Sequence, residues 1–177
     1  MTATVAGCTV LGGDTKLIGD TSEEDSSVLT FTDDGETVLK IQLVKQFSDD
    51  EFREYFPFFI ASWQPDGIRI DSLELRFRSI PRSSSGFTPA GISLREGAHA
   101  HMATLSRVDG HPSTTVIDLP DTTAIGDGSV RIDLLLKGDP LQEPQELWIQ
   151  AKATLSSDGT FGEAYEVRGD YTVKFPS

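Results

Sequence analysis

The sequence predicts an all-β protein, an antiparallel β-sandwich or jelly roll of about eight strands with one short helix. Apolar and polar residues alternate over most of the chain, most clearly in Ile68 to Ile80 and in Leu147 to Leu155. A period of two is that of a strand with one buried face. Turn-forming pairs such as Asp34-Gly35 recur about every ten residues, which is the strand spacing of a sandwich.

The expected strands follow one another between these turns. They are Val28 to Phe31, Val38 to Phe47, Ile68 to Ile80, Ala90 to Glu96, Thr114 to Leu119, Val130 to Lys137, Leu147 to Leu155, a strand with Tyr165 and Val167, and a last strand from Tyr171 to Phe175. In Ile68 to Ile80 the apolar phase slips by one residue at Asp71-Ser72. Such a slip predicts a β-bulge, because an extra residue reverses the side-chain alternation.

One short helix of about two turns is expected to begin at Ser48. Ser48 and Glu51 have the spacing of a capping box, and Phe47 and Phe52 have that of a hydrophobic staple. Pro57 then ends the helix, because proline disfavours helical geometry in the residue before it.

Aromatic residues gather immediately after this helix. They are Phe56, Phe58, Phe59 and Trp63. Core packing is the interpretation we prefer, because large aromatic side chains are usually buried. A platform on which a ligand stacks is the alternative.

The length of 177 residues fits one domain. Residues 1–27 are small, polar and acidic, so we expect an N-terminal arm that docks on the domain or on a neighbouring subunit. Residues 28–177 are expected to form a single jelly-roll domain. No apolar run reaches the roughly 18 residues of a membrane helix, and the single cysteine excludes an internal disulfide.

The chain carries a net charge of −13, with more Asp than Glu, more Arg than Lys and no Asn. This composition resembles that of proteins from extreme halophiles, in which high salt screens the self-repulsion of acidic surfaces. An ordinary acidic protein is the alternative. Without a basic patch, direct nucleic-acid binding is not expected.

No catalytic motif is present: the sequence lacks a nucleophile elbow, a phosphate-binding loop, an HExxH pair and a CxxC pair. We therefore expect no enzyme, no catalytic residue and no cofactor. His99 and His101 would share one face of a strand and form a candidate metal half-site. This His-x-His pattern is similar to part of the metal-binding motif of the cupin family. Ser93 and Leu105 stand where the cupin motif has Gly and Glu. No metal is expected, and a cupin-like metalloprotein is the weakest alternative.

Val5-Ala6-Gly7-Cys8 resembles a lipobox, the cleavage site before a lipidated cysteine. The residues before Cys8 contain neither a basic nor an apolar region of the usual signal-peptide kind. An inert arm is therefore the preferred interpretation. With lipid on Cys8, the chain would be a surface-anchored archaeal lipoprotein whose sandwich binds carbohydrate, stacked on Trp63 or Trp148.

Three stretches together resemble the single jelly-roll major capsid proteins of membrane-containing icosahedral haloarchaeal viruses. They are the long strand GIRIDSLELRFRS, the Gly-led strand GISLRE and the tail GDYTVKFPS. This resemblance implies a virion structural protein that assembles into capsomers. Its partners would be copies of itself and a related capsid protein, above an internal viral membrane. Under this leading hypothesis, subunit contacts would involve the N-terminal arm, Arg76, Arg78 and Trp148, which lies on the polar face of its strand.

Overall fold

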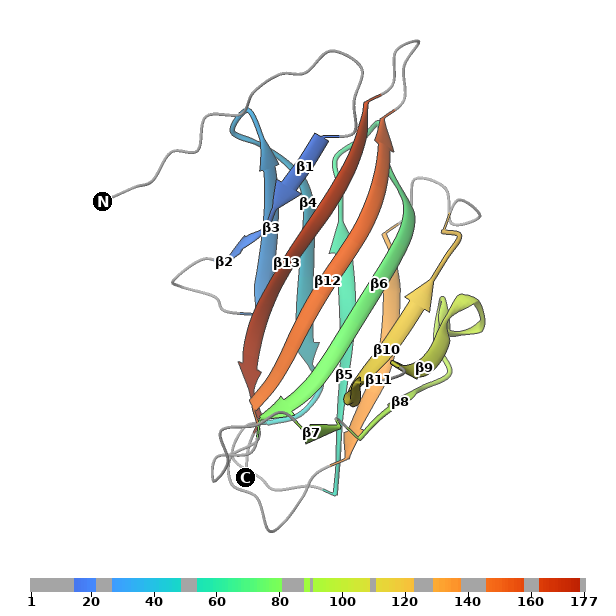
Figure 1. The fold of residues 1–177 in the computed structure, drawn as a ribbon. Helices are drawn as coiled ribbons and strands as arrows, with labels where there is room; N and C mark the ends of the chain where they lie inside the picture. Colours follow the sequence, from blue (N-terminus) through green and yellow to red (C-terminus); the bar gives the residue numbers. More distant parts are fainter. Residues whose placement is uncertain are drawn as a thin grey trace, which may run out of the picture.

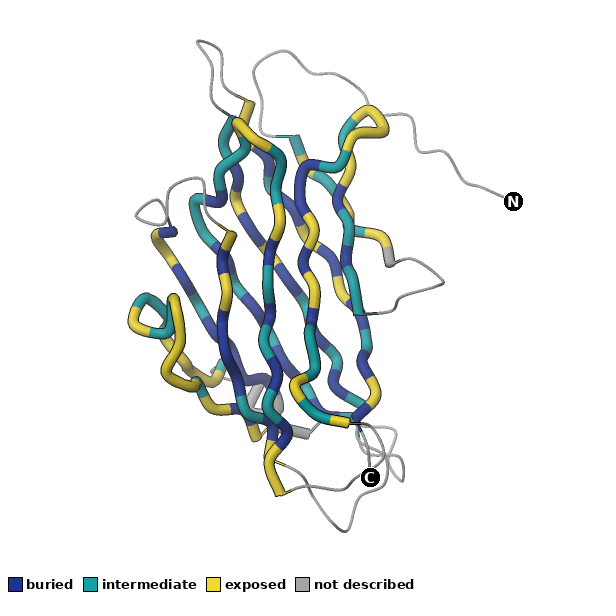
Figure 2. The backbone as a smooth tube through the Cα atoms, turned by 180° about the vertical axis from the view of Figure 1, so that it is seen from behind, coloured by how far each residue is buried: buried dark blue, intermediate teal, exposed yellow. Residues whose placement is uncertain are grey.

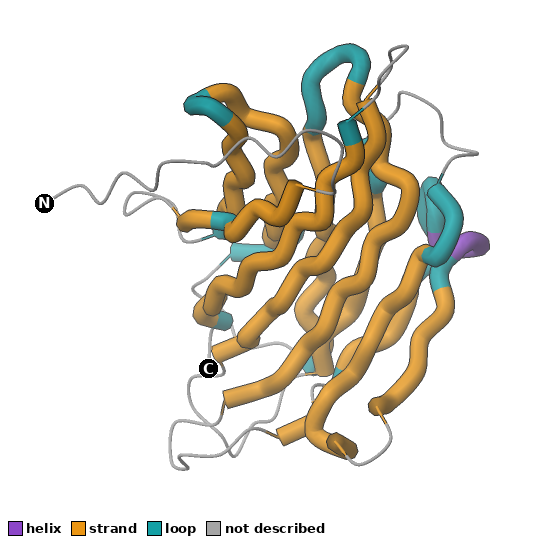
Figure 3. Tube along the Cα trace, turned by 45° about the horizontal axis from the view of Figure 1, so that its top comes forward, coloured by secondary structure: helices purple, strands orange, loops and turns teal. Residues whose placement is uncertain are grey.

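A computed structural model describes residues 15–21, 27–48, 54–80, 88–89, 91–108, 111–122, 129–137, 146–157 and 163–175. It confirms the predicted all-β sandwich. Two sheets pack face to face (Figure 1), and Figure 3 shows that most of the described residues belong to strands.

Sheet A has seven strands in the order β1-β13-β12-β6-β10-β9, with β7 paired to β6. Their bounds are β1 Thr15–Ile18, β6 Ile68–Ile80, β7 Thr88–Pro89, β9 Thr104–Val108, β10 His111–Leu119, β12 Glu146–Ser157 and β13 Ala164–Lys174. Sheet B has six strands in the order β2-β3-β4-β5-β11-β8. Their bounds are β2 Asp20–Thr21, β3 Val28–Asp33, β4 Glu36–Lys45, β5 Tyr55–Trp63, β8 Ile92–Leu94 and β11 Arg131–Lys137.

The sequence leaves open whether the strands follow jelly-roll order or another Greek-key order, and the structure shows how they are connected. The chain passes from sheet B to sheet A three times, from β5 to β6, from β8 to β9 and from β11 to β12. Strand β5 pairs with β11, and β6 pairs with β12. The same two interlocked pairs hold an immunoglobulin-type sandwich together. Strands β3, β4 and β5 are also successive neighbours, as in a meander.

The core lies between the inner faces of the two sheets. Along the strands, buried positions alternate with half-buried and exposed ones (Figure 2), as the period-two pattern predicts. The largest fully buried side chains include Phe31, Phe56, Phe58, Phe77 and Phe175. Phe175 packs edge-on against Phe56 and Phe58, with ring centres 6.0 and 5.7 Å apart.

The bulge predicted in β6 is confirmed. Thr154 of β12 pairs with Ser72, and the next residue, Leu155, pairs with Ile70. Asp71 is therefore the extra residue of the long strand, and it restores the inward direction of the apolar side chains after it.

The turn predicted at Asp34-Gly35 is also confirmed. Both residues have positive φ, 47° and 86°, which is the backbone of a two-residue type I′ hairpin turn. The turn joins β3 to β4.

The prediction of a helix beginning at Ser48 is wrong for its last described residues, because Tyr55 and Phe56 begin strand β5. Residues 49–53, the rest of that helix, lie outside the described residues. Pro57 is tolerated in β5 because of its position. Its carbonyl accepts the Gln46 N–H at 3.0 Å, so its ring nitrogen faces the end of β4, where the ladder stops and no N–H is needed.

The two closing strands expected around Gly169 are one continuous strand, β13. Gly169 is required by packing and not by a turn. A Cβ atom there would lie 2.9 Å from the side chain of Leu29 and 3.2 Å from the Cα of Gly19. The glycine therefore lets the link between β1 and β2 approach the sheet closely.

Residues 15–21, expected in the N-terminal arm, belong to the sandwich instead. Strand β1 pairs in parallel with β13 in sheet A, and β2 pairs with β3 in sheet B. The chain changes sheets at Gly19, whose N–H donates to the Arg168 carbonyl at 3.0 Å. Residues 1–14 and 22–26 of the expected arm, Cys8 among them, lie outside the described residues.

Candidate ligand-binding face

Arg78 and Trp148, both predicted as contact residues, are direct neighbours on the outer face of sheet A. The Arg78 guanidinium lies 4.9 Å from the centre of the Trp148 ring, and Arg78 Nε donates to Thr114 Oγ1 at 2.8 Å. Trp148 Nε1 donates to Asp170 Oδ2 at 3.0 Å. One face of the indole and its N–H thus contact other residues of the chain. These four side chains link the neighbouring strands β10, β6, β12 and β13.

Arg76, the third predicted contact residue, lies on the same face of sheet A. Its Nε donates to Glu74 Oε1 at 2.8 Å, and its second nitrogen donates to Glu74 Oε2 at 3.3 Å. The structure therefore brings the three predicted residues to one sheet face, where each has partners in the chain.

The outer face of β5 is the feature that sequence reasoning missed. Large aromatic side chains at Tyr55, Phe59 and Trp63 alternate there with the more compact Pro57 and Ala61. Trp63 is 51% exposed and Tyr55 is 46% exposed, whereas Phe59 is half-buried. We call Tyr55, Phe59 and Trp63 the aromatic row. A period-two interpretation of residues 55–63 as a strand would have found it.

Each member of the aromatic row has a cationic residue beside it. Lys40 of β4 pairs with Trp63, and its Nζ lies 5.6 Å from the ring centre. The Arg131 guanidinium of β11 lies 4.0 Å from the centre of the Phe59 ring. Lys137, also of β11, pairs directly with Tyr55.

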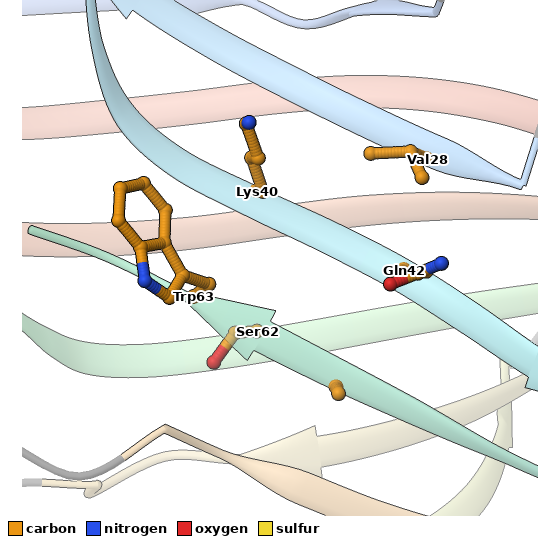
Figure 4. Close-up of a pocket in the computed structure, with 6 residues that line it drawn as sticks. Val28, Lys40, Gln42, Ser62 and Trp63 are labelled. Carbon is orange, nitrogen blue, oxygen red and sulfur yellow. The ribbon is translucent and has the colours of Figure 1, made fainter. Parts of the chain in front are cut away.

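A shallow groove of about 270 Å³ opens beside Trp63, lined by Val28, Lys40, Gln42, Ala61, Ser62 and Trp63. Figure 4 shows Lys40 and Trp63 standing together at one end, and Val28 and Gln42 at the other. The small side chain of Ala61 forms a low floor, because its neighbours along the strand, Phe59 and Trp63, are large.

Ser62 has a structural role at this groove. Its Oγ accepts the Val130 N–H at 3.0 Å, and its own N–H donates to the Val130 carbonyl at 2.9 Å. The hydroxyl therefore holds the end of β5 to the chain entering β11.

Asp133 is the carboxylate placed among these cations, and it is only 8% exposed. It accepts two hydrogen bonds from Arg131, at 2.9 and 3.1 Å. These hydrogen bonds raise the pKa of Arg131, against the smaller opposing effect of burial. Asp133 thus holds the Arg131 guanidinium over the Phe59 ring.

The prediction that His99 and His101 lie on a strand is wrong. Strand β8 ends at Leu94, and a short 3₁₀ helix, η1 (Ala100–Met102), contains His101. His99 Nδ1 accepts the Arg131 N–H at 2.9 Å. Within the described ranges, no group of three His, Cys, Asp or Glu residues could hold a metal ion, and no helix there is long and apolar enough to cross a membrane.

A family model described as "Domain of unknown function (DUF8121)" matches residues 15–177. The chain belongs to this family. The match begins at Thr15, which is also the first residue of β1. DUF8121 is defined without a known function, and no curated protein matches the sequence.

The solved structures similar to this DUF8121 member include three of low sequence identity. The human F-spondin reeler domain is 10% identical, with a TM-score of 0.44 over 76% of this chain and 86% of that one. The collagen adhesin of S. aureus is 10% identical, with a TM-score of 0.35 over 87% and 60%. BcpA, the major pilin subunit of Bacillus cereus, is 11% identical, with a TM-score of 0.31 over 78% and 41%.

Proposed function

We propose that this chain is a non-catalytic carbohydrate-binding module whose site is the outer face of β5. The observation that carries the proposal is the position of Trp63. Its indole is 51% exposed and stands at the end of a groove that also presents the Lys40 ammonium and the Gln42 amide. An aromatic ring packs against the apolar face of a sugar ring, while amide and ammonium groups bond to its hydroxyls.

The comparison of the two tryptophans supports this choice of face. Trp148 is stacked with Arg78 and hydrogen-bonded to Asp170, so one face of its ring and its N–H are already in contact with other residues of the sheet. Trp63 is more exposed, and the aromatic row continues from it along β5. Exposed apolar side chains gathered on one face typically mark a binding surface.

A lipid on Cys8 of the lipobox-like stretch Val5 to Cys8 would attach the module to a cell surface. The proposed binding site does not depend on this attachment. Intact mass of native protein tests this point separately, because a diacylated cysteine adds a mass that an unmodified chain lacks.

The test of the proposed function is binding of soluble oligosaccharides, measured by titration calorimetry. Trp63→Ala is expected to lower the affinity at least about thirtyfold, as the loss of a central aromatic anchor does. Trp148→Phe is the matched control on the opposite sheet and should leave the affinity unchanged. Equal affinity of Trp63→Ala and the parent chain, or loss of binding only in Trp148→Phe, would move the site away from β5.

A self-assembling shell subunit is the second candidate function. The aromatic row favours it as well, because a second copy could bury a half-exposed apolar strip. Light scattering in about 1 M salt, where charge repulsion is screened within about 3 Å, separates the two. Concentration-dependent assembly that Trp63→Ala abolishes supports the shell subunit, and a monomer at all concentrations contradicts it.

A further inference from the structure

We infer that the carbohydrate bound at β5 is a linear polyanion, a polysaccharide with uronate or sulfate groups. The inference rests on the proposed function and adds the length and charge of the ligand. It is carried by the repeated pairing of an aromatic ring with a cation along one strand.

The spacing of the rings sets the length of the site. Tyr55, Phe59 and Trp63 are four residues apart on one face of β5. At about 3.3 Å per residue, neighbouring rings are about 13 Å apart and the row spans about 26 Å. A site of this length, with an exposed ring at each end and the Arg131 guanidinium over the middle ring, suits an extended chain better than a single sugar.

Positively charged side chains lie beside all three rings of the aromatic row. Lys40 lies beside Trp63, Arg131 over Phe59 and Lys137 beside Tyr55. Asp133 is paired to Arg131 and almost buried. Among the described residues, Lys40 and Lys137 have no carboxylate within ion-pair distance.

The outer face of sheet A shows the opposite arrangement. Three of its cations lie next to acids: Arg76 with Glu74 at 2.8 Å, Arg69 with Asp71 at 3.4 Å, and Lys152 with Glu166 at 3.5 Å. The whole chain has a net charge of −13, so acidic residues are abundant. Two lysines beside an aromatic row, with no carboxylate of the described residues within ion-pair distance, therefore set the β5 face apart from these three acid-paired positions of sheet A.

The acids closest in sequence to β5 lie outside the row. Exposed Glu54 precedes Tyr55, and exposed Asp66 lies in the turn that follows the strand. They lie beyond the two ends of the aromatic row. Along the row, the carboxylate that lies beside the cations is the almost buried Asp133, which is paired with Arg131.

One charged sugar unit can contact a lysine and the adjacent aromatic ring at the same time. A carboxylate or sulfate accepts charge-assisted hydrogen bonds from a lysine ammonium, while the apolar face of the same sugar stacks on the adjacent ring. In about 1 M salt the Debye length is about 3 Å, so only groups in direct contact keep their attraction. A polyanion that places its charges against Lys40 and Lys137 meets that condition.

The experiment compares polygalacturonate oligomers with the same oligomers fully methyl-esterified, which keeps the sugar rings and removes the charge. Calorimetry in about 1 M salt would use the parent chain, the double variant Lys40→Gln/Lys137→Gln and Lys152→Gln. Lys152 is a matched control, because it is a half-exposed lysine on the opposite sheet face. Circular dichroism confirms that each variant is folded.

We expect the free acid to bind more tightly than the ester, and each lost lysine to lower its affinity up to about fivefold, the range of an exposed ion pair. Lys152→Gln should bind as the parent chain does. Equal binding of acid and ester, or an unchanged double variant, would overturn the polyanion inference. Carbohydrate binding that Trp63→Ala still weakens would then leave the proposed function standing, whereas no binding of either oligomer, or of neutral glycans, would overturn both.

Discussion

Lys40 Nζ lies 5.6 Å from the centre of the Trp63 ring, and the two residues are direct partners in the register of β4 and β5. The lysine is exposed and the ring is half exposed. An attraction of this kind at a wet surface is worth about 0.5–1 kcal/mol. The pair therefore positions the indole without burying it, which leaves the ring open to a ligand.

The first prediction concerns this pair. Lys40→Met keeps the aliphatic stem and removes the charge. A double-mutant cycle with Trp63→Leu, measured by urea unfolding, should give a coupling free energy of about 0.5 kcal/mol. A coupling above about 2 kcal/mol would show a desolvated contact and would assign the indole to the fold instead of to a ligand.

The second prediction concerns Tyr171, whose buried hydroxyl has no hydrogen-bond partner among the described residues. Tyr171→Phe removes an unsatisfied polar group, so the free energy of unfolding should stay equal or rise by up to about 1 kcal/mol. Tyr165→Phe is the matched control, because the Tyr165 hydroxyl donates to Glu163 at 2.5 Å. That variant should lose about 1–2 kcal/mol, and the reverse order of the two variants would contradict the assignment.

The third prediction concerns alkaline pH. Burial raises the pKa of Tyr171, and burial followed by the carboxylate of Glu163 raises that of Tyr165. The folded state therefore holds these protons to higher pH than the unfolded chain, in which a tyrosine has a pKa of about 10. Their contribution to stability is complete below about pH 10 and is lost above it, by about 1.4 kcal/mol per pH unit for each tyrosine.

Urea unfolding at several pH values above about pH 9 measures this slope. Tyr171→Phe should make the decline with pH shallower, because one of the two tyrosines no longer titrates. A decline of the same steepness in the variant would show that Tyr171 does not contribute to it.

The fourth prediction concerns Gly169 in the middle of β13. Gly169→Ala would place a Cβ 2.9 Å from the Leu29 side chain, so the substitution should cost about 1–3 kcal/mol of stability by overpacking. Lys174→Ala, at an exposed position of the same strand, is the control and should stay within about 0.5 kcal/mol. Thermal or urea unfolding compares the two, and a Gly169→Ala chain as stable as the control would show that the β1–β2 link can move away.

Sequence reasoning succeeded where the deciding interaction is local. The bulge at Asp71 was predictable because Ile70 and Leu73 must both point into the core. The turn at Asp34-Gly35 was predictable because few residue pairs accept two positive φ values.

Sequence reasoning failed where distant contacts overrule a local signal. The capping pattern at Ser48 predicted a helix reaching Phe56, but the pairing of β5 with both β4 and β11 gives that residue a place in the core. Two strands were expected between Tyr165 and Phe175, yet β13 continues through Gly169, whose lack of a side chain accommodates Leu29 from the opposite sheet. His99 and His101 were expected on one face of a strand, but they lie after the end of β8, around η1.

Local patterns in the chain predict the all-β class, the inner faces of the long strands and the chemistry of the turns, because side-chain alternation and backbone preference act over a few residues. Which strands are neighbours depends on contacts between distant parts of the chain. The tertiary structure placed Lys40 opposite Trp63 and Arg131 over Phe59, and it separated a face of paired charges on sheet A from an aromatic face with lysines on sheet B. Those contacts join strands far apart in the chain, and their register is set by the hydrogen bonding and packing of whole sheets.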